Sequence, residues 1–449
     1  MAGLIKAPNY FAPTNDFQRS LDRGKTVLKI MLETGAITRN EHDQALANPP
    51  ELRAYLPSES YGYVIDWVMQ QTAGLDLNSQ EDMVVETTID YEMQGVAQKI
   101  VKDNMEQHGA EYSAGEAAAV IMDTDGAIKA LVGGRDYTKK PYNRAVQAKR
   151  QPGSTFKMFV WLAALEKGLS PQSRVLDGPI QIGNWTPANY DNRYHGEVTL
   201  RDGLAYSMNT VSVRLSEWVG RDTVIKTAHR LGISSPLQNI PSIALGTSEV
   251  SLLEMTNAYV PLANGGFSAQ PHIIKAVRDA KGQYTYQIGQ TNWGRVIDPQ
   301  IVGAMNSMMI ATINVGTGHQ ASLDPHPAGG KTGTTQSYRD AWFIGYSHYY
   351  VAGVWVGNDD STPMKRVTGG GLPTMIWRDL MLYAHVGKEP IQLPGAEYQV
   401  SEDGAGDRSF LDSLFSSDPD PSLNQPNVTS STNNSPQSKE KSWLEELFE

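Results

Sequence analysis

The 449-residue chain contains no cysteine. This absence excludes a disulfide scaffold, a thiol nucleophile and a zinc site built from cysteine ligands. Long apolar runs are missing too, because no stretch approaches the ~20 apolar residues that a membrane-spanning helix requires. The N-terminus also lacks the basic region, apolar run and cleavage site, in that order, of a signal peptide. The sequence therefore predicts neither a membrane segment nor an export signal in this chain.

Excess basic charge is absent as well. The formal net charge is -11, and residues 401–449 hold ten acidic and only three basic side chains. That segment carries -7, which leaves -4 for residues 1–400. Residues 1–400 therefore present no positive electrostatic field that would attract nucleic acid, and no nucleic acid partner is expected. With 40% hydrophobic residues, the chain can bury the core of one large domain or two ordinary ones.

Two pairs of β-prone segments predict hairpins. Residues 117–122 and 127–132 flank an Asp-Thr-Asp-Gly turn, and residues 341–346 and 350–356 flank a Ser-His turn. Apolar periodicity predicts helices over residues 27–32, 154–167, 197–218 and 250–263.

The C-terminal segment has a different composition. Beyond about Glu402 it is rich in Ser, Asn, Pro and Asp with few apolar residues, which predicts a disordered tail. Its last residues, 443–448, would form an apolar helical face against a partner, and a solvated terminus is the alternative.

Ser154 and Lys157 follow Pro152-Gly153 at the start of a predicted helix. Their spacing puts both side chains on one helical face, so the amine can reach the hydroxyl. A lysine can take the proton of a serine if burial and nearby positive charge lower its pKa. Backbone N–H groups at the helix start can stabilise an oxyanion. Alone the spacing is weak evidence, since Ser438 and Lys441 repeat it in the tail.

Ser207 and Asn209 form a second candidate pair. From a turn between helices both can face one cavity, where the serine relays a proton and the asparagine amide holds a substrate carbonyl. The alternative for Ser207 is a helix cap. This pattern is also weak alone, because Ser422 and Asn424 repeat it.

The third candidate is Lys331-Thr332-Gly333-Thr334, which contains the only Lys-Thr-Gly in the chain. Glycine weakens a strand unless something approaches its backbone closely. A glycine-lined edge strand can pair with an extended peptide, and the lysine and hydroxyls beside it suit a substrate carboxylate. Without the other two pairs, a glycine-rich turn with a solvated lysine would be the better interpretation.

The order and spacing of the three motifs decide between these interpretations. Lys157 precedes Ser207 by 50 residues, and Asn209 precedes Lys331 by 122. Together with the segments 144–157, 198–201, 262–266 and 340–346, they resemble the penicillin-binding proteins. The resemblance is to the transpeptidase domain of the bifunctional, class A kind, and it covers roughly residues 84–390.

The resemblance implies an α/β fold of the α+β type, with a mainly antiparallel five-stranded sheet between helical layers. It implies that Ser154 attacks the carbonyl between the last two D-alanines of a peptidoglycan stem peptide. Lys157 would be the base, with Ser207 and Lys331 on the proton path to the leaving amine.

The remaining implied roles concern binding. The N–H groups of Ser154 and Thr334 would form the oxyanion hole, and the substrate-binding positions would be Asn209, Thr332, Gly333 and Thr334. Stem peptides and β-lactam antibiotics are the implied ligands, and other cell-wall synthesis proteins are open as partners. No metal or organic cofactor is needed. Three histidines near the motifs are expected to be surface or supporting groups: His195, His319 and His326.

The resemblance also suggests a domain plan. Residues 1–39 resemble the C-terminal end of the glycosyltransferase domain that precedes the transpeptidase in bifunctional enzymes. Residues 40–83 would be a linker, 84–390 the transpeptidase domain, and 391–449 an acidic disordered tail. The Glu-Asp-x-x-Phe-x-x-His-x-Gly motif of glycosyl transfer is absent, so that activity is not expected here. The intact family works at the periplasmic face of the bacterial inner membrane.

Three other functions compete. A serine β-lactamase needs a deacylating base, and no Glu-x-x-Leu-Asn segment stands between the second and third motifs. An antibiotic sensor of this fold is normally tied to a signalling membrane module, which the chain does not encode. An inert fragment of a bifunctional enzyme is the third, and cooperative unfolding of the chain would argue against it.

Overall fold

The computed structural model describes residues 17–49, 61–75, 82–289, 291 and 294–395. The chain divides into two units, residues 1–401 and 402–449. The second unit lies outside the described residues, and so does nearly all of the predicted tail, including its terminal docking helix. Both of those predictions stay predictions.

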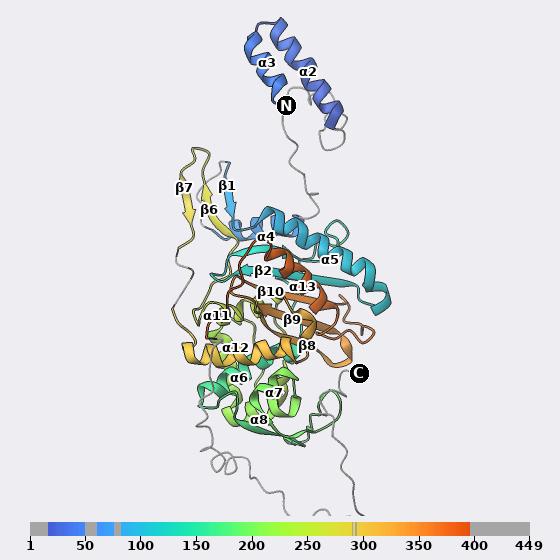
Figure 1. Cartoon of the computed structure of the whole chain (residues 1–449), viewed down its shortest axis with the longest axis vertical. Coiled ribbons are helices and arrows are strands. Elements are labelled where there is room, and N and C mark those ends of the chain that lie inside the picture. Colours follow the sequence, from blue (N-terminus) through green and yellow to red (C-terminus); the bar gives the residue numbers. More distant parts are fainter. Residues whose placement is uncertain (1–16, 50–60, 76–81, 290, 292–293, 396–449) are drawn as a thin grey trace, which may run out of the picture. The chain divides into compact units, whose positions relative to one another are not determined.

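A five-stranded antiparallel sheet forms the centre of the first unit (Figure 1). Its strands in spatial order are β3 (Ile128–Val132), β2 (Glu116–Asp123), β10 (Tyr350–Gly357), β9 (Asp340–Tyr346) and β8 (Gly329–Thr334). β2 pairs with β3, and β9 pairs with β10, so both predicted hairpins are confirmed. β8 pairs only with β9 and is an edge strand of this sheet, as the glycine-lined segment predicted.

Two helices cover one face of the sheet, α5 (Tyr91–Tyr112) and α13 (Leu372–Ala384) (Figure 1). Their apolar side chains share a core with alternate residues of the strands, among them Ile121, Phe343 and Val354. The indole N–H of Trp377 on α13 donates to the carbonyl of Ala352 at 3.0 Å, which ties the helix to β10. This packing fixes one side of the sheet.

The opposite face is covered by α10 (Leu252–Ala258) and α12 (Pro299–Asn314). A Cβ atom at Gly353 would lie 2.1 Å from the hydroxyl of Thr256 on α10, and one at Gly329 would lie 3.1 Å from Cβ of Met309 on α12. Glycine at these positions lets the helices approach the strands closely. The predicted α+β fold, a sheet between helical layers, is confirmed.

The described residues contain further elements. The remaining α-helices are α2 (Phe17–Glu33), α3 (Arg39–Ala47), α4 (Gly62–Ala73), α6 (Lys157–Glu166), α7 (Leu200–Ala205), α8 (Asn209–Val219), α9 (Arg221–Arg230) and α11 (Val260–Ala263). The 3-10 helices are η3 (Gly153–Phe156), η4 (Pro241–Leu245), η5 (His319–Ala321) and η6 (Gln336–Tyr338). One small sheet contains β1 (Val84–Thr87), β6 (Ile274–Arg278) and β7 (Tyr284–Gln287), and the other contains β4 (Arg174–Asp177) and β5 (Gly196–Thr199).

The helix predictions are only partly right. The helix predicted over 27–32 is confirmed within α2, and the one predicted over 154–167 begins as η3 and continues as α6. The single helix predicted over 197–218 is wrong, because this stretch forms β5, α7 and α8. It breaks at Ser207, whose φ of 59° lies in the left-handed region that a helix cannot contain. The helix predicted over 250–263 likewise divides into α10 and α11.

Part of the segment predicted as a linker packs into the folded unit. Tyr63 of α4 is fully buried, and its hydroxyl donates to the carbonyl of Lys140 at 2.8 Å. Val64 and Trp67 of the same helix are buried as well. This part of residues 40–83 therefore contributes to the core. The proposed origin of residues 1–39 is untested and stays a prediction.

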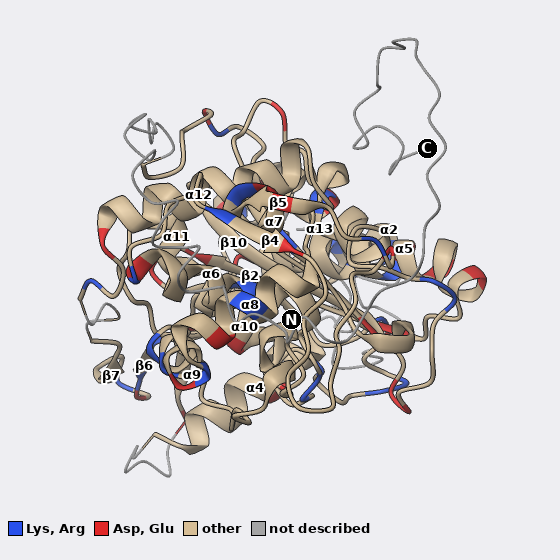
Figure 2. Cartoon of the chain, turned by 90° about the horizontal axis from the view of Figure 1, so that it is seen from below, with Lys and Arg blue, Asp and Glu red and all other residues tan. Residues whose placement is uncertain are grey.

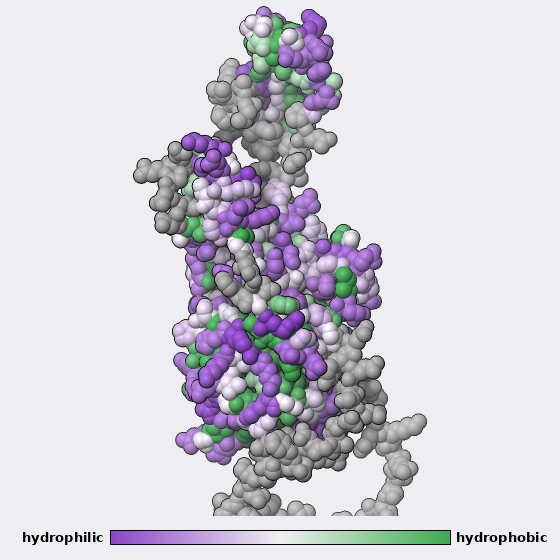
Figure 3. Space-filling model, turned by 90° about the vertical axis from the view of Figure 1, so that its left-hand side faces the viewer, coloured by the Kyte–Doolittle hydropathy of each residue, from purple (hydrophilic) through white to green (hydrophobic). Residues whose placement is uncertain are grey.

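Lysine and arginine residues are interspersed with aspartate and glutamate residues along the described chain (Figure 2). Hydrophilic residues dominate the face drawn in Figure 3, and apolar ones gather in limited areas of it. None of the helices within the described ranges has the length and apolar character needed to cross a bilayer.

Candidate active site

The predicted nucleophile lies in a tight turn packed against the edge strand. Ser154 is the second residue of η3, and the preceding Gly153 has a φ of 55°. A Cβ atom on Gly153 would stand 2.8 Å from the carbonyl oxygen of Thr334 on β8. The carbonyl of the next residue, Thr155, accepts a hydrogen bond from the buried Tyr259 hydroxyl at 2.7 Å. Glycine at position 153 therefore brings the serine directly beside β8.

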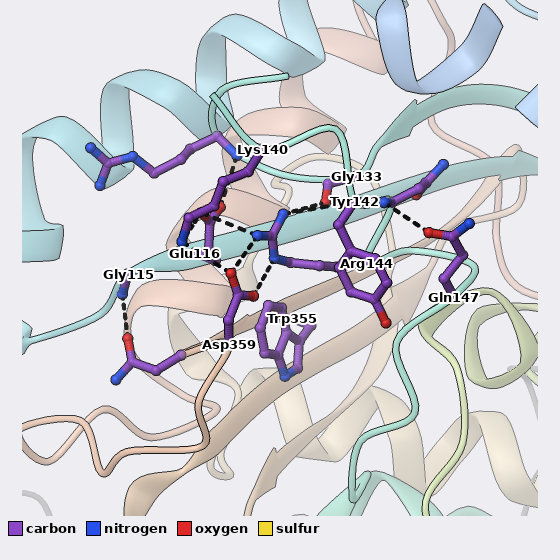
Figure 4. A network of polar contacts seen from close by, with 12 residues as sticks. Gly115, Glu116, Gly133, Lys140, Tyr142, Arg144, Gln147, Trp355 and Asp359 are labelled. Atoms are coloured by element: carbon purple, nitrogen blue, oxygen red, sulfur yellow. Dashed lines mark hydrogen bonds and ion pairs between the residues drawn. The ribbon is translucent and has the colours of Figure 1, made fainter. Parts of the chain in front are cut away.

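A buried arginine anchors the chain that leads to this turn (Figure 4). The guanidinium of Arg144 donates two parallel hydrogen bonds to Asp359, both at 2.6 Å, and lies 3.3 Å from Glu116. The Nη1 nitrogen of the same guanidinium donates to the carbonyl of Gly133 at 3.2 Å. Bidentate arginine–carboxylate pairs are strong and directional. They fix the segment before Ser154 to the ends of β2 and β10.

Lys157 is the first residue of α6 and is fully buried. Its amine donates to the backbone carbonyl of Ser207 at 2.6 Å and to the side-chain oxygen of Asn209 at 2.8 Å. The hydroxyl of Ser207 is 3.3 Å from the same amine. The break between α7 and α8 is what turns Ser207 and Asn209 toward Lys157.

Lys331, on β8, approaches the same serine from the other side. It is also fully buried, and its amine donates to the Ser207 hydroxyl at 2.9 Å. The Ser207 hydroxyl thus lies between two lysine amines. The structure brings together side chains that stand 174 residues apart, from Lys157 to Lys331.

The two amines are strongly perturbed. Burial, and then the positive charge of Lys331, hold the pKa of Lys157 well below its ordinary range, while Asp177 opposes them. Burial lowers the pKa of Lys331 to about 7. A neutral amine has a lone pair that can accept a proton. Ser154, Ser207 and Asn209 are partly exposed, whereas both amines are buried.

One expected contact is not formed. The Ser154 hydroxyl makes no hydrogen bond with any described residue, although we expect it near the Lys157 amine. The amine is instead engaged by Ser207 and Asn209. Nucleophile–base contacts are often long in enzymes without substrate, so this geometry does not exclude the pair.

The glycine of the third motif has a packing reason. A Cβ atom on Gly333 would stand 2.4 Å from the carbonyl oxygen of Pro152 and 2.9 Å from the methyl of Thr155. Any side chain there would push the nucleophile turn away from β8. The two neighbouring hydroxyls are tied down, since Thr332 lies 2.7 Å from the Thr317 hydroxyl and Thr334 accepts from the N–H of Gly369 at 2.9 Å.

Sequence reasoning missed the residues that support Asn209. Its backbone N–H donates to the side-chain oxygen of Asn189 at 2.8 Å, and Asn189 donates to the buried Asp177. Thr317 beside Thr332 was missed too. Asn189 precedes Asn209 by 20 residues, a separation for which no short motif exists.

Within the described residues, the hydrogen bonds given for the amines of Lys157 and Lys331 go to Ser207, Asn209 and Thr332. His195 is a supporting group, because it binds Asp177. The ring of His326 lies 4.6 Å from that of His385. Among the described residues, no group of His, Asp and Glu side chains is arranged to hold a metal ion.

A five-stranded antiparallel sheet between helical layers, with the three motifs gathered at its edge strand, is the architecture of the penicillin-binding transpeptidases. The model of the family described as "Penicillin binding protein transpeptidase domain" matches residues 117–381. The chain belongs to this family.

Named relatives agree with this assignment. Penicillin-binding protein 1A of Neisseria meningitidis (serogroup B, strain MC58) is 39% identical over 304 residues, which are 64% of this chain and 38% of that protein. Penicillin-binding protein 1A of Aquifex aeolicus is 30% identical over 471 residues, covering 85% of this chain and 65% of that protein. The chain thus spans less than two thirds of either relative. The resemblance to class A penicillin-binding proteins is confirmed.

Solved structures resemble it as well. The crystal structure of penicillin-binding protein 1A from Haemophilus influenzae has a TM-score of 0.68 at 25% identity, covering 88% of this chain and 80% of that one. The PonA1 protein of Mycobacterium tuberculosis, in complex with penicillin V, has a TM-score of 0.66 at 26% identity. It covers 75% of this chain and 96% of that one.

Proposed function

We propose that the chain is a peptidoglycan D,D-transpeptidase that works through an acyl-enzyme on Ser154. The serine oxygen bonds to the carbonyl carbon between the last two D-alanines of a stem peptide, and the terminal D-alanine leaves as the amine. An amine of a second stem peptide then takes the acyl group and frees the serine. Water in place of that amine would give D,D-carboxypeptidase activity.

The observation that carries the proposal is the pair of buried lysines on either side of Ser207. A neutral Lys157 uses both its hydrogens on the Ser207 carbonyl and on Asn209, which leaves its lone pair for a hydroxyl proton. Lys157 is therefore the base that removes the proton of Ser154. The Ser207 hydroxyl, bonded to Lys331, offers a path for a proton to the leaving amine.

The stem peptide is proposed to bind along the edge strand β8. A stem peptide can extend β8 as an added strand, with its carbonyl near the N–H groups of Ser154 and Thr334. Asn209 has one amide hydrogen on the carbonyl of Ala188 and a second that can hold the acyl chain. The hydroxyls of Thr332 and Thr334, with Lys331, suit the terminal carboxylate.

The comparisons support this function in the same region of the chain. The relative PonA1 is described in complex with penicillin V, and we propose that penicillin acylates Ser154 here. The family suggests a place at the periplasmic face of a bacterial inner membrane. No glycosyl transfer is proposed for this chain.

The test is release of D-alanine from a synthetic peptide ending in D-Ala-D-Ala, with and without an acceptor amine. The chain should release D-alanine and join the peptide to the acceptor. Ser154→Ala and Lys157→Ala should each abolish or severely reduce both products, while far-ultraviolet circular dichroism stays unchanged. A chain that binds penicillin covalently but releases no D-alanine would be a sensor, and the transpeptidase proposal would be rejected.

A further inference from the structure

Asp177, the last residue of β4, is a buried carboxylate outside the three motifs. It is fully buried, and it accepts from the Asn189 side chain at 2.7 and 2.9 Å, from the His195 backbone N–H at 2.9 Å and from the His195 ring at 2.7 Å. The Thr210 hydroxyl also donates to it. A buried carboxylate is tolerated only when its oxygens are saturated in this way.

The network leads to the active site through Asn189. The side-chain oxygen of Asn189 accepts the backbone N–H of Asn209 at 2.8 Å and, more weakly, that of Thr210 at 3.3 Å. Asn209 accepts from the Lys157 amine at 2.8 Å. Three hydrogen-bonded steps therefore connect the carboxylate of Asp177 with the amine.

The carboxylate also acts through its charge. Burial raises its pKa, but hydrogen bonds from Thr210, Asn189 and His195 bring the pKa below its ordinary value, so Asp177 is an anion at neutral pH. Its charge raises the pKa of Lys157 against burial and Lys331. The charged and titratable groups around these two side chains are Lys331, Arg214, His195 and, 3.6 Å beyond the His195 ring, Asp191.

We propose that Asp177 is a positioning residue for the acylation of Ser154: it locks Asn189, which in turn fixes Asn209 and the amine of Lys157. The inference rests on the proposed function, because it assigns a support to that same site. It gives the segment between β4 and β5 a role in acylation, which the three motifs alone do not imply.

The test uses Asp177→Asn, which keeps the size of the side chain. The new amide group would face hydrogen-bond donors, and the negative charge would be lost. The second-order rate of acylation by a fluorescent penicillin should fall about 10- to 100-fold, as expected when catalytic groups are misplaced. The acid limb of the pH profile should move to lower pH, because loss of the anion lowers the pKa of Lys157. A purely structural role would not move this limb.

Three further variants isolate the path. Glu197→Gln removes an exposed charge from β5, the strand that pairs with β4, and it should acylate within twofold of the wild type. Asn189→Ala should reproduce the loss of rate. The double variant Asp177→Asn/Asn189→Ala should be no slower than the slower single variant, because both changes break one path. If Asp177→Asn does not fold, Asn189→Ala carries the test: its acylation rate should fall about 10- to 100-fold, while its acid limb should stay at the wild-type pH because Asp177 keeps its charge.

The outcomes separate the two proposals. A wild-type chain that takes up no penicillin, or takes it up on another residue, refutes the proposed function. A wild type acylated on Ser154, with Asp177→Asn and Asn189→Ala acylated at wild-type rates, refutes only the positioning role. Additive losses in the double variant with an unmoved acid limb would also overturn it.

Discussion

Replacement of Lys331 by methionine should stabilise the fold while it destroys acylation. The amine is fully buried, and burial lowers its pKa from 10.5 to about 7. Each pKa unit corresponds to about 1.4 kcal/mol, so at neutral pH and below the buried amine costs the fold about 5 kcal/mol. Methionine has similar length and no charge to desolvate. The variant loses hydrogen bonds to Ser207 and Thr332, worth about 1 kcal/mol each. The expected net gain at pH 7 is therefore about 3 kcal/mol.

The gain should depend on pH in a defined direction. Between about 7 and 10.5 the unfolded chain binds a proton at Lys331 that the folded chain does not, so stability of the wild type rises with pH in this window. Below about pH 7 Lys331 is protonated in both the folded and the unfolded chain, so burial of its charge destabilises the fold by the full amount. Above about pH 10.5 the amine is neutral in both states, and this destabilisation is gone. The advantage of Lys331→Met should therefore be largest at pH 7 and below, and should disappear near pH 10.

Urea unfolding at pH 7 and pH 10 measures this difference. Lys226→Met is a matched control, because Lys226 is exposed on α9, and its effect should stay within about 0.5 kcal/mol at both pH values. The reasoning would be refuted if Lys331→Met destabilised the fold at pH 7, or if its gain did not shrink as the pH rises. Acylation by penicillin should be lost in this variant at every pH.

Three other predictions follow from the site and its supports. Gly333→Ala should cut acylation at least tenfold and destabilise the fold by about 1–3 kcal/mol, because the added Cβ would stand 2.4 Å from the Pro152 oxygen; urea unfolding and penicillin labelling measure both. Arg144→Met should destabilise by about 2–3 kcal/mol, because the buried Glu116 and the partly exposed Asp359 would lose this partner and keep the exposed Lys140, and a loss below about 1 kcal/mol in thermal unfolding would contradict this. Acylation of the wild type should slow as pH falls from 8 to 6, because Lys331, whose pKa burial lowers to about 7, becomes protonated in this range, and stopped-flow rates that stay constant would count against a role for neutral Lys331.

The motifs could be predicted because each is a short pattern that fixes its own local structure. Ser154 and Lys157 lie one helical turn apart. Lys331 and Gly333 are two residues apart on a strand, so these two residues share the face of β8 that packs against the nucleophile turn. The hairpins were predictable because their turns are short and their strands are continuous apolar runs. The joining of the three motifs at one edge came from the resemblance, since no local pattern specifies it.

The features that the sequence did not predict have physical reasons. The left-handed φ of Ser207 is held by tertiary contacts to Lys157 and Lys331, and no glycine marks the break. Asp177 lies 32 residues before Asn209, so only the folded chain shows that they are connected. The packing of α4 did leave a signal, because Tyr63 and Trp67 lie one helical turn apart within an apolar run. Pro49, Pro50 and Pro57 precede this run and favour the linker interpretation.

Ser154 is the residue that we propose becomes acylated. Mass spectrometry of the chain after reaction with penicillin, followed by peptide mapping, tests this proposal most directly. One penicillin should be bound per chain, on the peptide that contains Ser154, and none should bind to Ser154→Ala. An adduct on any other residue, or equal labelling of Ser154→Ala, would contradict the account.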